Sequence, residues 1–258
     1  MKKTFLIFVF LVSLLPVKVF TQSFAGESAD FEYRYLIDMP TAGVLKKGYV
    51  SFVSDLMPKG AVVSRLEVGV FDGLSFGISY GGENVIGSGE VNWYKYPGVN
   101  IRYKIIEESQ TLPSMALGFD SQGKGEFFNN ADRFEIKSPG FFAAVSKNYE
   151  FLGYLSLHGA VNYSLETKDG DNFVNLAIGL EKTIGRQVSF VAEYNFALND
   201  NKNDLYGRGN GYLHVGVRWN IGKGLMFGLD LRDMLDNKLW NPSKADRALK
   251  FEFSQRIL

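Results

Sequence analysis

The chain of 258 residues contains no cysteine and only two histidines. Without cysteine it can form no disulfide framework, no thiolate metal site and no lipid anchor on an N-terminal cysteine. Two histidines are also too few for the ligand sets that transition metals usually require. We therefore expect neither a metal nor another cofactor.

An excess of charge is missing as well. Lys+Arg and Asp+Glu both number 28, so the sequence offers no basic surface of the kind that binds nucleic acid. The mean hydropathy is −0.06, and beyond the first 25 residues no segment is apolar enough for a membrane helix.

The N-terminus carries an export signal. Lys2 and Lys3 precede the apolar run FLIFVFLVSLLPV, and the small residues Ser23 and Ala25 follow it. A membrane-anchor helix is the alternative, but the run is short and Pro16 interrupts it. Residues 1–25 are therefore predicted to be a secretory signal peptide.

The rest of the chain is rich in residues that suit strands and turns, with 22 Phe, 13 Tyr and 28 Gly but only 7 Pro. In the stretch LHVGVRWNIGKGLMFGLDLRD, bulky apolar residues alternate with small or charged ones on both sides of Gly-Lys-Gly, which predicts two strands and a tight turn. Twelve such strands are expected, near 48–56, 64–71, 74–81, 98–106, 113–120, 140–148, 152–164, 173–183, 187–196, 211–221, 224–232 and 248–257.

The connections between these strands alternate in length. Asp72-Gly73 and Gly222-Lys223 are tight turns, whereas GGENVIGSGEVNWYKY and SQGKGEFFNNADRFEIKS are long polar loops. Short turns at one end and long loops at the other are typical of outer-membrane barrels. We therefore predict an all-β fold, a transmembrane antiparallel up-and-down β-barrel of about 12 strands spanning residues 48–258, in the outer membrane of a Gram-negative-type bacterium. A soluble secreted β-protein is the alternative.

Two regions fit this pattern less well. The stretch FFAAV in the sixth strand has no clean period of two. Residues 26–47, which include FEYRYLID, are assigned to an N-terminal lead that is periplasmic or forms an extra strand, and a plug is also open.

The small and charged faces of the strands are predicted to line the lumen, and the bulky apolar faces to meet lipid. The residues expected to line the lumen are Arg65, Glu67, Arg102, Lys104, Asp120, Glu181, Glu193, Arg218, Asp230 and Arg232, with Lys250 and Glu252 in the last strand. Since both signs are present, a closed interior with paired charges and a narrow, weakly selective passage both remain open.

Catalysis is not expected. Ser156, His158 and Asn162 share the lumen face, whereas the outer-membrane phospholipase uses such a group on its lipid-facing side. His214 lies near Glu181 and Glu193, but the paired acidic doublets of outer-membrane proteases are absent from the sequence.

The stretches IDMPTAGVLKKGYVSF and PGVNIRYKIIEESQTLPSMALGFDSQGKGEF resemble the YjbH-type outer-membrane barrels, over roughly Met39 to Gly185. The resemblance implies the same fold and a link to the export of extracellular polysaccharide. Members of that family are usually longer, and many begin as lipoproteins. No site residue is carried over from it.

Together these features predict a narrow pore or an accessory component in the transport or export of hydrophilic solutes or polysaccharide. A closed structural or binding barrel, whose extracellular loops contact surface polymer or a partner, is the alternative. The expected partners are outer-membrane lipid and the barrel-assembly machinery, with polysaccharide or small hydrophilic solutes as cargo and no nucleic acid.

Overall fold

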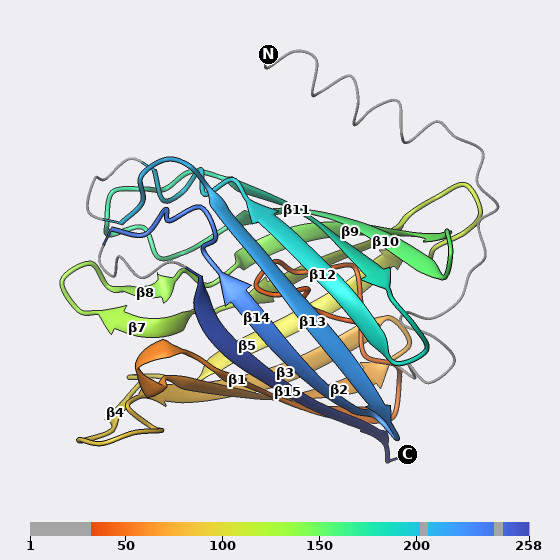
Figure 1. Cartoon of the computed structure of the whole chain (residues 1–258), viewed down its shortest axis with the longest axis horizontal. Coiled ribbons are helices and arrows are strands. Elements are labelled where there is room, and N and C mark those ends of the chain that lie inside the picture. The colour runs from red at the N-terminus through yellow and green to blue at the C-terminus, as the bar shows by residue number, and fades with distance from the viewer. Residues whose placement is uncertain (1–31, 202–205, 240–244, 258) are drawn as a thin grey trace, which may run out of the picture.

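The computed structural model describes residues 32–201, 206–239 and 245–257, so the predicted signal peptide lies outside the described residues. Within them, twelve antiparallel strands form one closed barrel (Figure 1). The barrel strands are β1 (Tyr49–Leu56), β2 (Val62–Phe71), β3 (Leu74–Glu83), β5 (Gly98–Ile106), β6 (Ser114–Asp120), β9 (Gly140–Glu150), β10 (Tyr154–Tyr163), β11 (Asn175–Thr183), β12 (Val188–Asn195), β13 (Tyr212–Gly222), β14 (Leu225–Arg232) and β15 (Asp246–Arg256). The prediction of an all-β barrel of about twelve strands is confirmed.

Each barrel strand pairs with its neighbours in sequence, and the first strand closes the sheet by pairing with the last. In this seam β1 and β15 run antiparallel, with Phe52 opposite Phe253. Closure leaves no free edge in the barrel, so its backbone polar groups are paired within the sheet, as a hydrocarbon surrounding requires.

The two faces of each strand differ in the predicted way. On β13 and β14 the outward pairs are Val217 with Leu229 and Trp219 with Phe227, whereas Arg218 is buried inside. All the other barrel strands except β12 likewise expose large apolar side chains, and examples are Leu66, Ile78, Ile101, Leu117, Ile178 and Leu249. An apolar surface that continues around the barrel suits lipid rather than water. No helix in the described residues is long and apolar enough to cross a membrane.

The connections are sorted by length between the two ends of the barrel. The short turns lie at one end, where the N–H of Ile257 also bonds to the carbonyl of Gly48 at 2.8 Å. The long loops lie at the other end, the left side of Figure 1. They carry the short elements η1 (Pro58–Gly60), β4 (Asn92–Trp93), β7 (Lys124–Phe128) and β8 (Arg133–Ile136).

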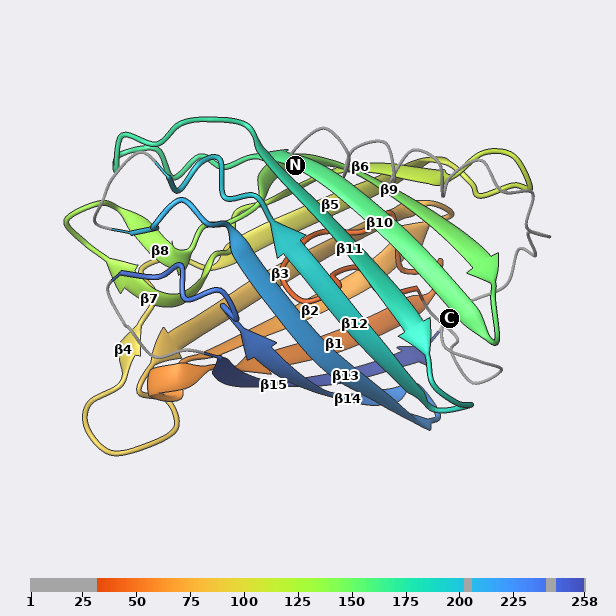
Figure 2. The same ribbon diagram turned by 45° about the horizontal axis from the view of Figure 1, so that its top comes forward.

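Residues 32–47 form a segment that lies inside the barrel up to Leu45, where the red and orange trace runs through the lumen in Figures 1 and 2, and Lys46 and Lys47 are exposed at its end. This segment, called the hairpin plug below, enters from the short-turn end and reverses at Leu36–Met39. The N–H of Leu36 bonds to the carbonyl of Met39, and the N–H of Thr41 to that of Arg34, each at 3.1 Å. The assignment to a periplasmic lead or an extra strand is therefore wrong for the described part of 26–47, which is a plug.

The plug also explains the irregular sixth strand. Leu36, Ile37 and Met39 pack in one buried cluster with inward-facing Phe142 and Ala144 of β9. The strand still alternates, but its inner face is apolar where it contacts the plug. Both faces of β9 are consequently apolar, and the period of two is hidden in the sequence.

Candidate functional site: the lumen and its plug

The residues predicted to line the lumen all place their side chains inside the barrel. Nine of the ten are buried as whole residues, and the side chain of Lys104 is 7% exposed. They do not face an open channel, because most of them contact the hairpin plug or one another. The contacts fall into three levels from the short-turn end to the loops.

At the first level Arg34 of the plug joins three strands. Its guanidinium lies 2.9 Å from Glu67 on β2 and 2.5 Å from Glu252 on β15, and it donates to Ser51 on β1 at 2.7 Å. Arg34 therefore spans the seam at which the barrel closes. Next to it, Glu32 of the plug pairs with Lys104 at 2.7 Å.

At the second level the aromatic ring of Tyr35 lies between two guanidinium groups. Arg65 and Arg102 lie 4.6 and 4.3 Å from its ring centroid, which is the distance of a cation–π contact. The hydroxyl of Tyr35 donates to Asp120, which also pairs with Arg65 at 2.6 Å. Arg102 donates to the plug carbonyl of Thr41 at 3.2 Å.

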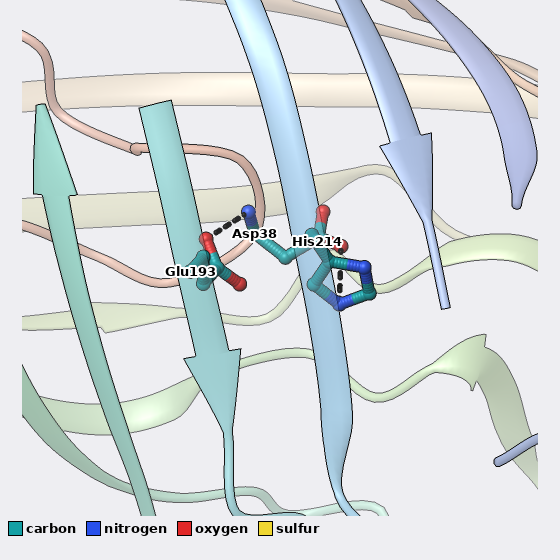
Figure 3. A group of neighbouring side chains, drawn as sticks. All are labelled: Asp38, Glu193 and His214. Carbon is teal, nitrogen blue, oxygen red and sulfur yellow. Dashed lines mark hydrogen bonds and ion pairs between the residues drawn. The ribbon is translucent and has the colours of Figure 1, made fainter. Parts of the chain in front are cut away.

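The third level is the tip of the plug, where Glu193 of β12 binds the turn. Its Oε2 atom accepts the backbone N–H groups of Ile37, Asp38 and Met39 at 3.0, 2.9 and 3.0 Å, and Figure 3 shows the bond from Asp38. Three converging N–H groups form a concave anion-binding site. On β13 and β14, Arg218 pairs with Asp230 at 2.6 Å and donates to the carbonyl of Leu36 at 2.7 Å.

The side chain of Asp38 enters a cationic pocket, and its carboxylate lies within 4.8 Å of that of Glu193. It forms ion pairs with Arg232 of β14 and with Lys124 of β7, the latter at 3.2 Å. His214 Nε2 lies 4.0 Å from the same carboxylate.

Asp38, Glu193 and His214 are close enough to suggest a metal site. Ligand atoms of the three lie within 4.8 Å of one another. However, two cations already neutralise Asp38, and His214 Nδ1 accepts the N–H of Asp233 at 3.1 Å. The arrangement therefore fits an internal ion-pair cluster better than a divalent cation.

Beyond the plug tip, on the long-loop side, lies a cavity of about 80 Å³ that is lined by charged, amide and apolar residues. This space is large enough for several water molecules, at about 10–15 Å³ each. Asp38, Arg232 and His214 line it on the plug side. On another wall an amide row crosses three strands, since Asn175 Nδ2 donates to Asn162 Oδ1 at 3.3 Å and to Asn195 Oδ1 at 2.9 Å.

Charged groups of the loops surround the outer part of this cavity. Arg133 of β8 pairs with Asp169 at 2.8 Å and with Asp200 at 2.6 Å. Burial raises the pKa of the Asp200 carboxyl, although Arg133 opposes the change. Burial also raises the pKa of Glu166, which accepts the N–H groups of Phe134 and Ser138, both at 2.8 Å.

The catalytic candidates do not assemble. The hydroxyl of Ser156 donates to Asn148 at 2.5 Å, whereas His158 pairs with Ser146 at 2.8 Å. Asn162 donates to the carbonyl of Pro139 at 2.9 Å. Ser156 is therefore not activated by His158 in this geometry.

Sequence reasoning missed the plug residues that bind this wall, chiefly Arg34, Tyr35 and Asp38. A signal was present in FEYRYLID, where charged residues alternate with bulky ones next to an N-terminal lead. It could not be interpreted because the partners of these residues lie far away in sequence, as with Arg34 and Glu252, which are 218 positions apart.

The closed barrel, its apolar exterior and its charged, plugged interior define an outer-membrane-type β-barrel. No family model and no curated protein matches the chain. Among solved structures, the KdgM porin is 7% identical with a TM-score of 0.47, covering 81% of this chain and 99% of its own. The NanC porin is 11% identical with a TM-score of 0.42, covering 81% and 100%. The Acinetobacter baumannii outer membrane protein Omp33 is 8% identical with a TM-score of 0.44, covering 81% and 97%. Likenesses at this level carry no argument about what this chain transports or binds.

Proposed function

We propose that this protein lies in the bacterial outer membrane and conducts small hydrophilic solutes through its lumen, which the hairpin plug closes at rest. The main support is the polar character of the plug's attachment. Arg34, Asp38 and the backbone of the turn are held by ion pairs and hydrogen bonds to wall residues. Water or a polar solute can replace such contacts, so their net contribution to stability is modest.

The balance of charge on the wall supports a weakly selective path. Arg65 pairs with Asp120 and Arg218 with Asp230, both at 2.6 Å, so the wall keeps little net field when the plug leaves. A twelve-stranded barrel is also intermediate between barrels filled by side chains, with about eight strands, and open porins with about sixteen. Low conductance and weak ion selectivity are the expected properties.

The YjbH-type resemblance implies a link to polysaccharide export, so we propose polysaccharide as a further cargo. The proposed partners are outer-membrane lipid and the barrel-assembly machinery. We propose no enzymatic activity. The filled lumen favours a second candidate, a closed barrel whose loops bind surface polymer or a partner.

A reversible lock on the plug separates the two candidates. The N–H of Ala42 in the plug lies 3.1 Å from Ser146 Oγ on β9, and the chain has no cysteine of its own. In an Ala42→Cys, Ser146→Cys double variant, oxidation should abolish conductance in planar bilayers and reduction should restore it. Each single variant is the control.

Two results would count against the transport proposal. One is a folded wild-type protein that conducts no ions, which would leave the closed barrel as the function. The other is unchanged conductance in a double variant whose disulfide has been verified by mass spectrometry.

A further inference from the structure

The carboxylate of Asp38 occupies a position that suits an external anion. It is held by Arg232 and, at 3.2 Å, by Lys124, and its side chain is 6% exposed. Lys124 is shared with Asp55 at 2.7 Å. In the described part of the chain, no carboxylate other than that of Asp38 lies within 4.0 Å of Arg232, so the plug supplies its direct ion pair. Asp230 and Asp55 of the wall act on the guanidinium from farther away.

On the Arg232 side this cationic pocket opens to the long-loop end of the barrel, whereas Lys124 does not line the cavity there. Asp38, Arg232 and His214 form one wall of the 80 Å³ cavity, which is bounded by the loops. The amide row of Asn162, Asn175 and Asn195 lines the same cavity. A solute that enters from outside therefore reaches amides that can bond to hydroxyl groups and a guanidinium that can bind a carboxylate.

We propose that Arg232 and Lys124 form a binding site for the carboxylate of a small polyhydroxy acid, that Asp38 occupies this site when the plug is closed, and that the solute displaces Asp38 and releases the plug. This inference rests on the proposed transport function and names the class of solute. The site is open to the solute only when Asp38 has left it, so the solute binds the released state of the plug better than the closed state. A ligand with this preference shifts the equilibrium toward release.

Release of the plug can be measured by cysteine labelling, because the native chain has no cysteine. Ala42 in the plug is 0% exposed, and an Ala42→Cys variant reports when the plug leaves the lumen. Gluconate should raise its rate of reaction with a maleimide at least about fivefold, the lower end of typical coupling between two sites. Sorbitol, which has the same carbon chain without a carboxylate, should not. The control is Ala248→Cys, which is buried against Met57 and Ala61 and not under the plug, and its rate should stay constant.

Two substitutions test the occupancy of the site by Asp38. Asp38→Asn removes the internal competitor, so titration calorimetry should show tighter binding of gluconate than in the wild type. Arg232→Gln removes the main cation and should weaken gluconate binding by about tenfold or more, since charge-assisted bonds are the strong ones. A merely structural ion pair would make both variants less stable without giving either an affinity for gluconate.

The inference is overturned if gluconate binds wild-type protein and Asp38→Asn no better than sorbitol does, or if it leaves labelling of Ala42→Cys unchanged. If Asp38→Asn does not fold, the labelling result on the otherwise unaltered chain decides. The disulfide lock on the plug tests transport without any solute acid. Conductance that the lock controls but gluconate does not affect would therefore refute this inference alone.

Discussion

The backbone N–H of Asp38 donates to the carboxylate of Glu193 at 2.9 Å, so two acidic residues meet at the tip of the plug with carboxylate oxygens within 4.8 Å of each other. This is possible because the turn presents three N–H groups to Glu193, while the Asp38 carboxylate faces Arg232. One oxygen of a wall residue thus fixes the whole turn, as Figure 3 shows for Glu193 and Asp38.

Glu193→Gln should weaken the closed state. The amide keeps the size of the side chain but loses the negative charge that three N–H groups bind, and we expect a loss of about 1–3 kcal/mol. The measurement is the temperature at which the folded, fast-migrating band disappears on a denaturing gel. Glu181→Gln on the adjacent strand is the control: Glu181 is equally buried, at 1% exposure, but its carboxylate oxygens have no hydrogen-bond partner among the described residues. Removing that charge should leave stability unchanged or raise it, and an equal loss in both variants would contradict the role given to Glu193.

Gly179→Val should displace the plug. A Cβ atom at Gly179 would lie 2.4 Å from Leu36 Cδ2, 2.9 Å from Met39 Sδ and 3.0 Å from the carbonyl oxygen of Ala192, so the side chains of the turn must shift, and the two methyl groups of valine add to the displacement. We expect higher conductance in planar bilayers than in the wild type, with the barrel still folded. Gly159→Val on the neighbouring strand is the matched control, because a Cβ atom there would meet only Val145 Cγ2, at 3.3 Å. Identical conductance in the two variants would show that the plug does not control the path.

Leu229→Arg should be strongly destabilising because Leu229, near the middle of β14, faces outward with 49% exposure. A charge at mid-depth in lipid costs roughly 2–4 kcal/mol, whereas the cost near the membrane surface falls to about 0–1 kcal/mol. Leu152→Arg at the tip of a short turn, where the side chain is 88% exposed, is therefore the control and should be mild. Unfolding of both variants in lipid vesicles gives the comparison. Equal losses would mean that the exterior does not meet lipid.

The loop layer should be more stable at mildly acidic pH than at neutral pH. Burial raises the pKa of Glu166 above its usual 4.5, so the folded protein retains a proton that the unfolded chain has lost. This contribution is fully present below the usual pKa and is lost as the pH rises through the raised value. Glu166→Gln should therefore flatten the decline in melting temperature between about pH 5 and about pH 7. Asp132→Asn is the control, since exposed Asp132 has its pKa lowered by the bond to Lys168, and a decline as steep in Glu166→Gln as in the wild type would refute the assignment.

The strands could be predicted from sequence because each has one lipid face and one lumen face. Val217, Trp219 and Leu229 are exposed, as their alternation with Arg218 and Gly228 indicates. The period of two is a local property, so it does not depend on which strands pair. The alternation of apolar and polar residues is lost at Phe142 and Ala144, because the inner face of β9 meets the apolar part of the plug there instead of polar groups.

The plug could not be predicted in the same way. Its shape is set by residues from distant strands, such as Glu193 for the turn and Glu252 for Arg34. Neither Arg34 nor Asp38 has a local pattern that identifies its partner. For the same reason, the ten lumen residues could be placed on the inner face from sequence, but their contacts with the plug could not.

The position of Arg34 links the plug to the closure of the barrel. Arg34 contacts Ser51, Glu67 and Glu252, which come from the first, second and last strands of the barrel, so these three residues lie together only after the two ends of the sheet have joined. Before the seam closes, the guanidinium of Arg34 cannot contact Glu67 and Glu252 at the same time. The full set of contacts that holds Arg34 therefore exists only in the closed barrel, so a barrel with an open seam would also hold its plug less firmly.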